Sequence, residues 1–252
     1  MNKRKTLLVT GATSGVGYAT AMRLLSHPDR YTVYVTGRAP EKLWELQNEG
    51  AIPIPADITK TEEMESILKQ TGPLDIVIFS AGVGHFEPAH LLSDEAIRSM
   101  MDTNFIAPVE MTKRILPQMM EQQEGQLIYI GSQAGKVATP KASVYAASKH
   151  ALIGYTNALR MEVAPFGIHV SIIHPGPIDT PFIDGADRTG NYRSSLGNHL
   201  LNVGTVADAV VQTIGKPVRE INLPGIMGLT SKLYALSPGV VEKVGRKYFM
   251  KK

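Results

Sequence analysis

The chain has 252 residues, of which 43% are hydrophobic and 19% are charged, a composition that excludes a disordered chain. Its net charge of +3 is too small to indicate a nucleic-acid partner, and the absence of cysteine excludes disulfides and thiolate metal sites. The apolar run at residues 6–10 is too short for a signal peptide, and no run approaches membrane-spanning length. We therefore expect a cytoplasmic protein.

Short apolar runs alternate with longer amphipathic stretches along the chain. Several runs are continuous in Val, Ile and Leu, as expected for parallel strands covered on both faces. The alternation predicts a doubly wound, parallel, seven-stranded sheet, a Rossmann-like three-layer α/β sandwich in one domain over residues 1–252. The expected strands are 6–10, 32–36, 51–54, 75–79, 126–130, 169–173 and 218–223, and the expected helices are 15–26, 41–49, 61–70, 94–121, 144–164 and 206–214.

Two stretches break this alternation. Residues 177–202 are rich in Gly, Asp, Asn and Ser and follow the carboxyl end of a strand, where open α/β sheets bind ligands. They are either a substrate loop or irregular surface packing. Residues 224–252 form an atypical tail that could cap the site, pack on the body, or contact a subunit or a membrane. Basic residues gather at both ends of the chain and indicate solubilising tails, or alternatively an anionic surface partner: Lys3, Arg4, Lys5, Lys243, Arg246, Lys247, Lys251 and Lys252.

A glycine-rich loop joins the first expected strand to the first expected helix. Glycines let the backbone approach a pyrophosphate, and the helix N-terminus presents free N–H groups and partial positive charge to it. The strand–loop–helix context favours a dinucleotide site over a merely structural turn, although the spacing differs from the commoner dehydrogenase pattern. The loop residues expected to bind the cofactor are Gly11, Thr13, Ser14, Gly15, Val16 and Gly17.

The second expected strand indicates which nicotinamide cofactor is bound. NAD sites usually place an acid at the end of this strand to bind the ribose 2′-hydroxyl. Here the strand is followed by Gly37 and Arg38, and no carboxylate is present. The planar guanidinium of Arg38 suits a 2′-phosphate, so we expect NADP(H). The alternative is that Arg38 is an ordinary surface arginine.

A serine, a tyrosine and a lysine follow the fifth expected strand. Carbonyl reduction by a nicotinamide needs a proton donor and a group that polarises the carbonyl. Ser132 lies at the carboxyl end of the strand, and Tyr145 and Lys149 lie four residues apart on one helix face. The lysine ammonium and an oxidised nicotinamide should together favour the tyrosine phenolate. The three residues therefore predict acid–base chemistry on a carbonyl or alcohol.

Over nearly its whole length the chain resembles the classical short-chain dehydrogenase/reductase family. The resemblance rests on six motifs in order: the glycine loop with Thr10, Asp57 after the third strand, Asn104, the Ser132–Tyr145–Lys149 set, Pro175–Gly176, and Thr180. It implies that Asp57 contacts the adenine and that Thr180 meets the nicotinamide carboxamide. The other cofactor contacts that it implies are Ile58, Ala81, Gly82, Pro175, Gly176, Ile178, Tyr145 and Lys149.

The resemblance also implies a proton relay through Asn104. Pro108 lies four residues later in an otherwise helical stretch, and proline cannot donate to the carbonyl of Asn104. We expect a local kink that frees this carbonyl for a water leading towards Lys149; the alternative is a proline that only bends a long helix. The chain departs from the family at Phe79 and Ser80, where the family has two asparagines, and after the last strand, where its usual Asp-Gly-Gly is missing.

Together these features predict an oxidoreductase that transfers hydride between NADP(H) and a small-molecule carbonyl or alcohol. Asn104, Ser132, Tyr145 and Lys149 are its expected catalytic residues, and no metal is expected. A homodimer or homotetramer is expected, without a nucleic-acid partner and with peripheral membrane contact possible only through the tail. The alternative function is a nicotinamide-binding regulator or scaffold without turnover. The substrate is not predicted, but its pocket is expected among residues 84–88, 133–139 and 177–202.

Overall fold

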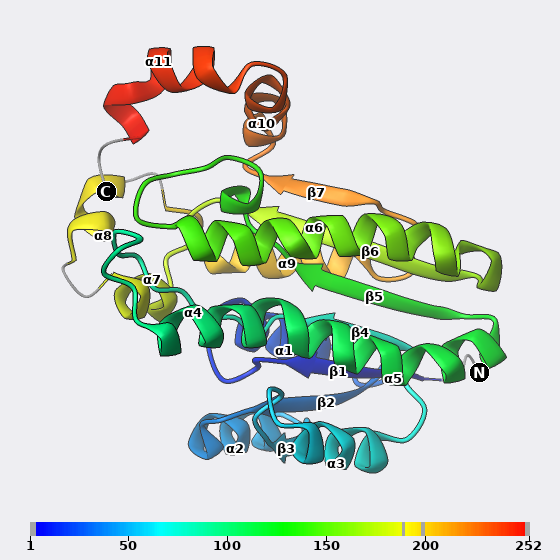
Figure 1. Ribbon diagram of the computed structural model, residues 1–252. Coiled ribbons are helices and arrows are strands. Elements are labelled where there is room, and N and C mark those ends of the chain that lie inside the picture. Colours follow the sequence, from blue (N-terminus) through cyan, green and yellow to red (C-terminus); the bar gives the residue numbers. More distant parts are fainter. Residues whose placement is uncertain (1–3, 188–189, 198–199, 250–252) are drawn as a thin grey trace.

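A seven-stranded parallel sheet forms the centre of the molecule (Figure 1). The computed structural model describes residues 4–187, 190–197 and 200–249, so Lys3, Lys251 and Lys252 lie outside it. The strand order β3-β2-β1-β4-β5-β6-β7 is that of the predicted doubly wound sheet. The strands are β1 (Lys5–Thr10), β2 (Tyr31–Gly37), β3 (Ile52–Pro55), β4 (Ile76–Phe79), β5 (Gly125–Ile130), β6 (Ile168–Pro175) and β7 (Glu220–Leu223).

Helices cover both faces of the sheet because successive strand residues point to opposite sides. In β1, Leu8 packs into one apolar cluster, whereas Leu7 and Val9 pack into the other. The cluster around Leu8 takes buried side chains from α3 (Thr61–Thr71), α5 (Ala107–Gln122) and α6 (Ser143–Val163). The opposite cluster takes them from α1 (Gly15–Leu25), α2 (Pro40–Asn48) and α9 (Val203–Thr213).

The helix expected over 94–121 is interrupted in the structure. It consists of α4 (Asp94–Met101), a π-helical turn (Asp102–Ile106) and α5. The N–H of Ala107 donates to the carbonyl of Asp102, five residues back, and the next residue, Pro108, has no N–H to give. The wide turn therefore carries Asn104 four residues before the proline, where the sequence predicted a kink.

Both stretches that broke the alternation contain helices that the sequence analysis missed. Between β6 and α9 lie α7 (Pro181–Ala186) and α8 (Asn191–Leu196), and after β7 lie α10 (Ile226–Leu236) and α11 (Pro238–Phe249). Figure 1 shows α10 and α11 beyond the β7 edge of the sheet, at the same end as α7 and α8. Across the described ranges, no helix is both long and apolar enough to cross a membrane.

Candidate active site

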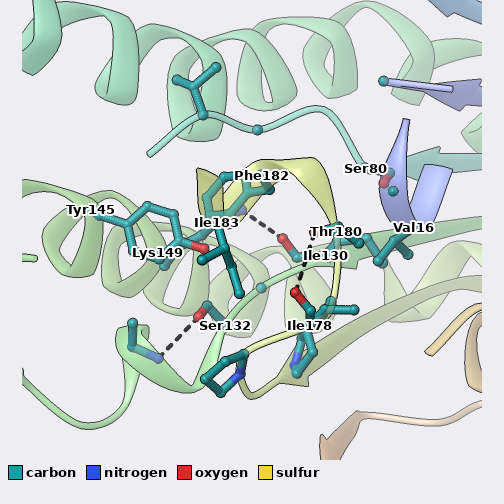
Figure 2. Close-up of a pocket in the computed structure, with 18 of the residues that line it drawn as sticks. Val16, Ser80, Ile130, Ser132, Tyr145, Lys149, Ile178, Thr180, Phe182 and Ile183 are labelled. Carbon is teal, nitrogen blue, oxygen red and sulfur yellow. Dashed lines mark hydrogen bonds between the residues drawn. The ribbon is translucent and has the colours of Figure 1, made fainter. Parts of the chain in front are cut away.

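A cavity of about 620 Å³ opens at the carboxyl ends of the strands, across the point where the strand order reverses between β1 and β4. Figure 2 shows part of its lining, with Tyr145, Lys149 and Ser132 grouped along one side. Of the predicted site residues, only Gly17 and Asn104 do not line it. Those that do are Gly11, Thr13, Ser14, Gly15, Val16, Arg38, Asp57, Ile58, Ala81, Gly82, Ser132, Tyr145, Lys149, Pro175, Gly176, Ile178 and Thr180.

The glycine loop brings backbone close to backbone. Gly11 has φ +64°, and a Cβ there would lie 2.5 Å from the Cα of Ala81. A Cβ on Gly17 would collide with the carbonyl of Gly11, so Gly17 allows the loop to fold against α1. Gly17 itself does not line the cavity. Ser14 precedes α1 in extended conformation and its side chain makes no capping bond. The Ser14 side chain therefore caps none of the first-turn N–H groups of α1. Gly15 and Val16, which belong to this turn, line the cavity.

The unusual Phe79–Ser80 pair is held in two ways. The hydroxyl of Thr10, at the end of β1, accepts from the backbone N–H groups of Ser80 (3.2 Å) and Ala81 (3.3 Å). The ring of Phe79 stacks on Tyr129 of β5, with centroids 4.6 Å apart. Two hydrogen bonds from the turn after β4 to Thr10 of β1 and an apolar stack therefore fix the segment without the two asparagines of the family pattern.

Arg38 and Asp57 line the cavity after β2 and β3, on the opposite side of β1 and β4 from Ser132, which follows β5. The Asp57 carboxylate accepts from the backbone N–H (3.0 Å) and hydroxyl (2.7 Å) of Thr59. Partial burial works to raise the pKa of Asp57, but these two bonds and the nearby Arg38 charge outweigh it and lower the pKa. Arg38 is exposed and lines the cavity, so its guanidinium is accessible to an anion there.

Ser132, Tyr145 and Lys149 come together as the sequence predicts. Ser132 follows β5 directly, and Tyr145 and Lys149 lie one turn apart on α6. The Ser132 side chain lies near the Tyr145 hydroxyl and accepts from the N–H of Ala134 at 3.1 Å, and the Lys149 Nζ donates to the carbonyl of Ile130 at 2.8 Å. A Cβ on Gly135 would lie 2.8 Å from the backbone carbon of Lys149, so the turn after Ser132 packs directly on α6.

Burial controls the titration of both α6 residues. Burial raises the pKa of Tyr145 to about 12, against the lowering effect of the nearby Ser132 side chain. Burial also lowers the pKa of Lys149 to about 8. The sequence analysis expected the lysine ammonium and an oxidised nicotinamide together to favour the tyrosine phenolate. In the structure the ammonium donates to the Ile130 carbonyl, and without the nicotinamide Tyr145 is a neutral phenol at neutral pH.

Asn104 lies behind the cavity wall and is 1% exposed. Its side chain accepts from the N–H of Val83 (2.8 Å) and donates to the Val83 carbonyl (2.9 Å) and the Ser148 hydroxyl (3.0 Å). A Cβ on Gly82 would be 3.2 Å from Asn104 Oδ1 and 3.6 Å from Lys149 Nζ. The π turn thus places Asn104 and Lys149 around Gly82.

An aromatic wall surrounds Tyr145. Phe86 lies edge-on to Tyr145, Phe182 and Tyr192, with ring centroids 5.6, 6.4 and 5.3 Å apart. Its backbone N–H donates to the carbonyl of Ala186 at 2.8 Å, which ties the wall to α7. These residues belong to the ranges expected to line a substrate pocket. Their side chains make the surroundings of the Tyr145 hydroxyl predominantly apolar.

An arginine fixes α7 and α8 against each other. Arg193 of α8 donates to the carboxylates of Asp184 (2.6 Å) and Asp179 (2.7 Å) and to the carbonyl of Thr180 (3.2 Å). Its charge is therefore already paired, and it is not an unengaged pocket cation. The clamp sets the orientation from which Phe182 and Tyr192 face the cavity.

The sequence analysis did not predict the part of the lining that comes from α10. Met227 and Thr230 of this helix line the cavity, and a Cβ on Gly176 would be 3.0 Å from the Met227 sulfur. The missed signal is the apolar spacing of Ile226, Leu229, Leu233 and Leu236, which is helical. Of the three alternatives for the tail, capping of the site is thus correct for α10.

A polar network supports the segment that follows Ser132. The Gln133 amide donates to the carbonyl of His174 and to Asn222 Oδ1, both at 2.9 Å. Lys136 donates to Glu220 (2.9 Å) and to Asn222 (3.0 Å). Burial lowers the pKa of His174 to about 4, so its ring is neutral at physiological pH. The network joins the turn after β5 to β6 and β7.

Comparisons with known proteins agree with this geometry. The family model for short chain dehydrogenases matches residues 5–189, so the chain belongs to the short-chain dehydrogenase family. A ketoacyl reductase, HetN, of Nostoc sp. is 32% identical over 96% of this chain and 88% of its own. A 3-ketodihydrosphingosine reductase of Bacteroides thetaiotaomicron is 35% identical over 71% of this chain; the match spans 65% of that protein's length.

Solved structures support the same family. The closed form of a serine dehydrogenase complexed with NADP+ superposes with a TM-score of 0.80 at 29% identity, covering 86% of this chain and 93% of that one. The superposition agrees with the strand order and flanking helices described above.

Proposed function

We propose that the chain is an NADP(H)-dependent oxidoreductase acting on a carbonyl or alcohol substrate. The observation that carries the proposal is the convergence of Ser132, Tyr145 and Lys149 on one side of a cavity that the glycine loop and Arg38 also line. The close approach at Gly11 and the uncapped α1 N-terminus fit a dinucleotide, whose nicotinamide supplies or accepts hydride when bound.

In the reductive direction, each residue of the set has a distinct task. Ser132 holds the substrate oxygen next to the Tyr145 hydroxyl, near which its side chain lies. Tyr145 donates its proton to the developing alkoxide, which its protonated state at neutral pH allows. Lys149 binds ribose and stabilises the resulting phenolate, and Asn104 positions the Val83 backbone and, through Ser148, α6.

The direct test is NADPH consumption with a panel of ketones, aldehydes, quinones, sugars and steroids. Turnover of any carbonyl supports the proposal. NADPH binding without turnover on the whole panel would instead support the alternative, a nicotinamide-binding regulator or scaffold. The aromatic wall around Tyr145 leads us to expect turnover first among apolar carbonyls.

The cofactor preference gives a second prediction. Arg38→Ala should weaken NADPH binding by roughly 10- to 100-fold and leave NADH binding nearly unchanged, because a charge-assisted hydrogen bond contributes about 1.5–3 kcal/mol. Fluorescence titration with both cofactors measures the effect. Arg30→Ala, which removes an exposed arginine before β2, is the control. Equal loss for both cofactors would contradict a 2′-phosphate contact.

The pKa of Lys149 predicts how carbonyl reduction depends on pH. Because burial lowers this pKa to about 8, the ammonium is present below pH 8 and is lost as the pH rises through it. Tyr145 stays protonated throughout, since its pKa is raised to about 12. We expect kcat/KM for reduction to be flat from about pH 6 to 7.5 and to fall above about pH 8.

The Lys149→Arg variant tests whether the Lys149 ammonium is the group whose titration causes the alkaline fall in kcat/KM. The guanidinium keeps its charge over the whole range, so the residual activity of this variant should lack the alkaline fall. An alkaline fall of the same position and shape in the arginine variant would mean that another group titrates.

A further inference from the structure

The two helices after β7 present an unusual surface. Of the eleven large apolar side chains that are exposed in the described part of the chain, six lie on α10 and α11. We define the α10–α11 surface by these six: Ile226, Leu229, Leu233, Leu236, Val240 and Val244. Figure 1 shows both helices at the periphery, beyond the last strand of the sheet.

The spacing of these residues gathers them on the outer faces of the helices. The four on α10 are three, four and three residues apart, and the two on α11 are four apart, so each set shares a helix face. Ser231, by contrast, is 5% exposed, and Met227 lines the cavity. Leu236 and Val244 are 81% and 82% exposed. The outer faces are thus apolar and uncovered, while the inner face of α10 meets the body.

The two helices are joined to each other through a polar contact. The Tyr234 hydroxyl donates to the Glu242 carboxylate at 2.8 Å. This bond engages the sole acidic residue between 226 and 252 and holds α11 against α10. The apolar residues of both helices consequently belong to one surface.

Charge indicates what this surface binds. Residues 226–252 contain six basic residues and one acid, whereas the preceding 225 residues contain 20 basic and 22 acidic ones. Lys232, Lys243 and Arg246 are exposed beside the apolar residues. In a symmetric dimer through this surface, each basic cluster would meet its own copy, and like charges would repel. Apolar side chains flanked by cations instead match an anionic lipid surface, with its acyl chains beneath the headgroups.

We propose that the α10–α11 surface docks the protein on an anionic lipid bilayer. The apolar stripe enters the boundary between headgroups and acyl chains, and the lysines and arginine contact lipid phosphates. Since Met227 and Thr230 of α10 line the cavity, docking places the cavity rim next to the bilayer. This last step rests on the proposed function, for which it would supply lipophilic carbonyls or alcohols; the docking itself does not depend on turnover.

The test is co-sedimentation of the full chain with vesicles of phosphatidylcholine, with and without about a third of phosphatidylglycerol. Wild type should bind the anionic vesicles, less at high salt, and bind the neutral ones weakly. Leu236→Ser with Val244→Ser, and Lys243→Glu with Arg246→Glu, should each weaken binding by roughly tenfold or more. Met161→Ser and Lys113→Glu, exposed sites on α6 and α5, are matched controls and should bind as wild type.

Three results would overturn the proposal. They are absence of vesicle binding by wild type, unchanged binding by both double variants, and an assembly without lipid that the variants dissociate. The last, measured by sedimentation velocity, would make the surface an interface between copies. Circular dichroism and NADPH titration check that the variants are folded. Because binding is measured without substrate, its failure remains distinct from a failure of the proposed reaction.

Discussion

Tyr145→Phe should lower kcat for carbonyl reduction by roughly a thousandfold or more, with NADPH binding within about twofold of wild type. The phenylalanine ring keeps the edge-on packing with Phe86, so the change removes a hydroxyl and little else. General acid catalysis by a positioned side chain contributes about 10²–10⁴-fold, and here the proton donor itself is lost. Steady-state kinetics on the first substrate found, with fluorescence titration of NADPH, measures both quantities.

Tyr155→Phe provides a matched control on the same helix. Tyr155 is partly buried and packs edge-on to Phe105 and Tyr129, away from the cavity lining. It should retain wild-type kcat and lose at most about 1 kcal/mol of stability. If Tyr145→Phe retained more than about a tenth of wild-type kcat, Tyr145 would not be the proton donor, and the proposed mechanism would fail.

Gly11→Ala should abolish detectable NADPH binding and destabilise the fold by about 2–5 kcal/mol. The left-handed φ of +64° costs an alanine about 1–2 kcal/mol. The new Cβ would also lie 2.5 Å from the Cα of Ala81, so β1 and the turn after β4 would have to separate. Thermal unfolding and cofactor titration measure the two losses.

Gly215→Ala isolates the backbone component of this effect. Gly215 has φ +73° and nothing within 4 Å of a built Cβ, and it lies after α9 away from the cavity. It should lose only about 1–2 kcal/mol and bind NADPH normally. Equal stability losses in the two variants would show that the close contact between the new Cβ and Ala81 contributes nothing to the loss of stability in Gly11→Ala.

Much of the fold follows from patterns visible in the sequence. Short apolar runs predicted the seven strands, and several of these runs are continuous in Val, Ile and Leu because parallel strands covered on both faces have no polar side. Five residues of the glycine loop and Ser132, Tyr145 and Lys149 line the cavity as predicted, since strand ends and helix turns fix where those residues lie. Gly17 is the one predicted loop residue that does not line the cavity. The sequence does not distinguish a glycine required for backbone packing from one required for the approach of a ligand.

Other features depended on tertiary contacts. Pro108 indicated an irregular helix near Asn104. That the irregularity is a π turn depends on the buried hydrogen bonds of Asn104 with Val83 and Ser148. The titration of Tyr145 could not be predicted because its pKa depends on the burial around the ring and on the nearby Ser132 side chain. The helices α7 and α8 are six residues each, too short for a periodic signal.

Because Arg193 holds α7 and α8 together, the substrate preference of the protein can be changed separately from the proposed reaction. Phe182 and Tyr192 line the cavity from a segment that is held mainly through Arg193 and its two aspartates. The residues proposed for hydride and proton transfer lie instead on α6 or directly after β1, β4 and β5. Exchange of residues 181–197 as one cassette that keeps Asp184 and Arg193, so that Arg193 can still bond to Asp179 outside the cassette, therefore offers a way to re-engineer substrate preference. Related proteins could likewise vary in sequence within residues 181–197, because a change in this part of the cavity lining leaves the proposed catalytic residues and the glycine loop in place.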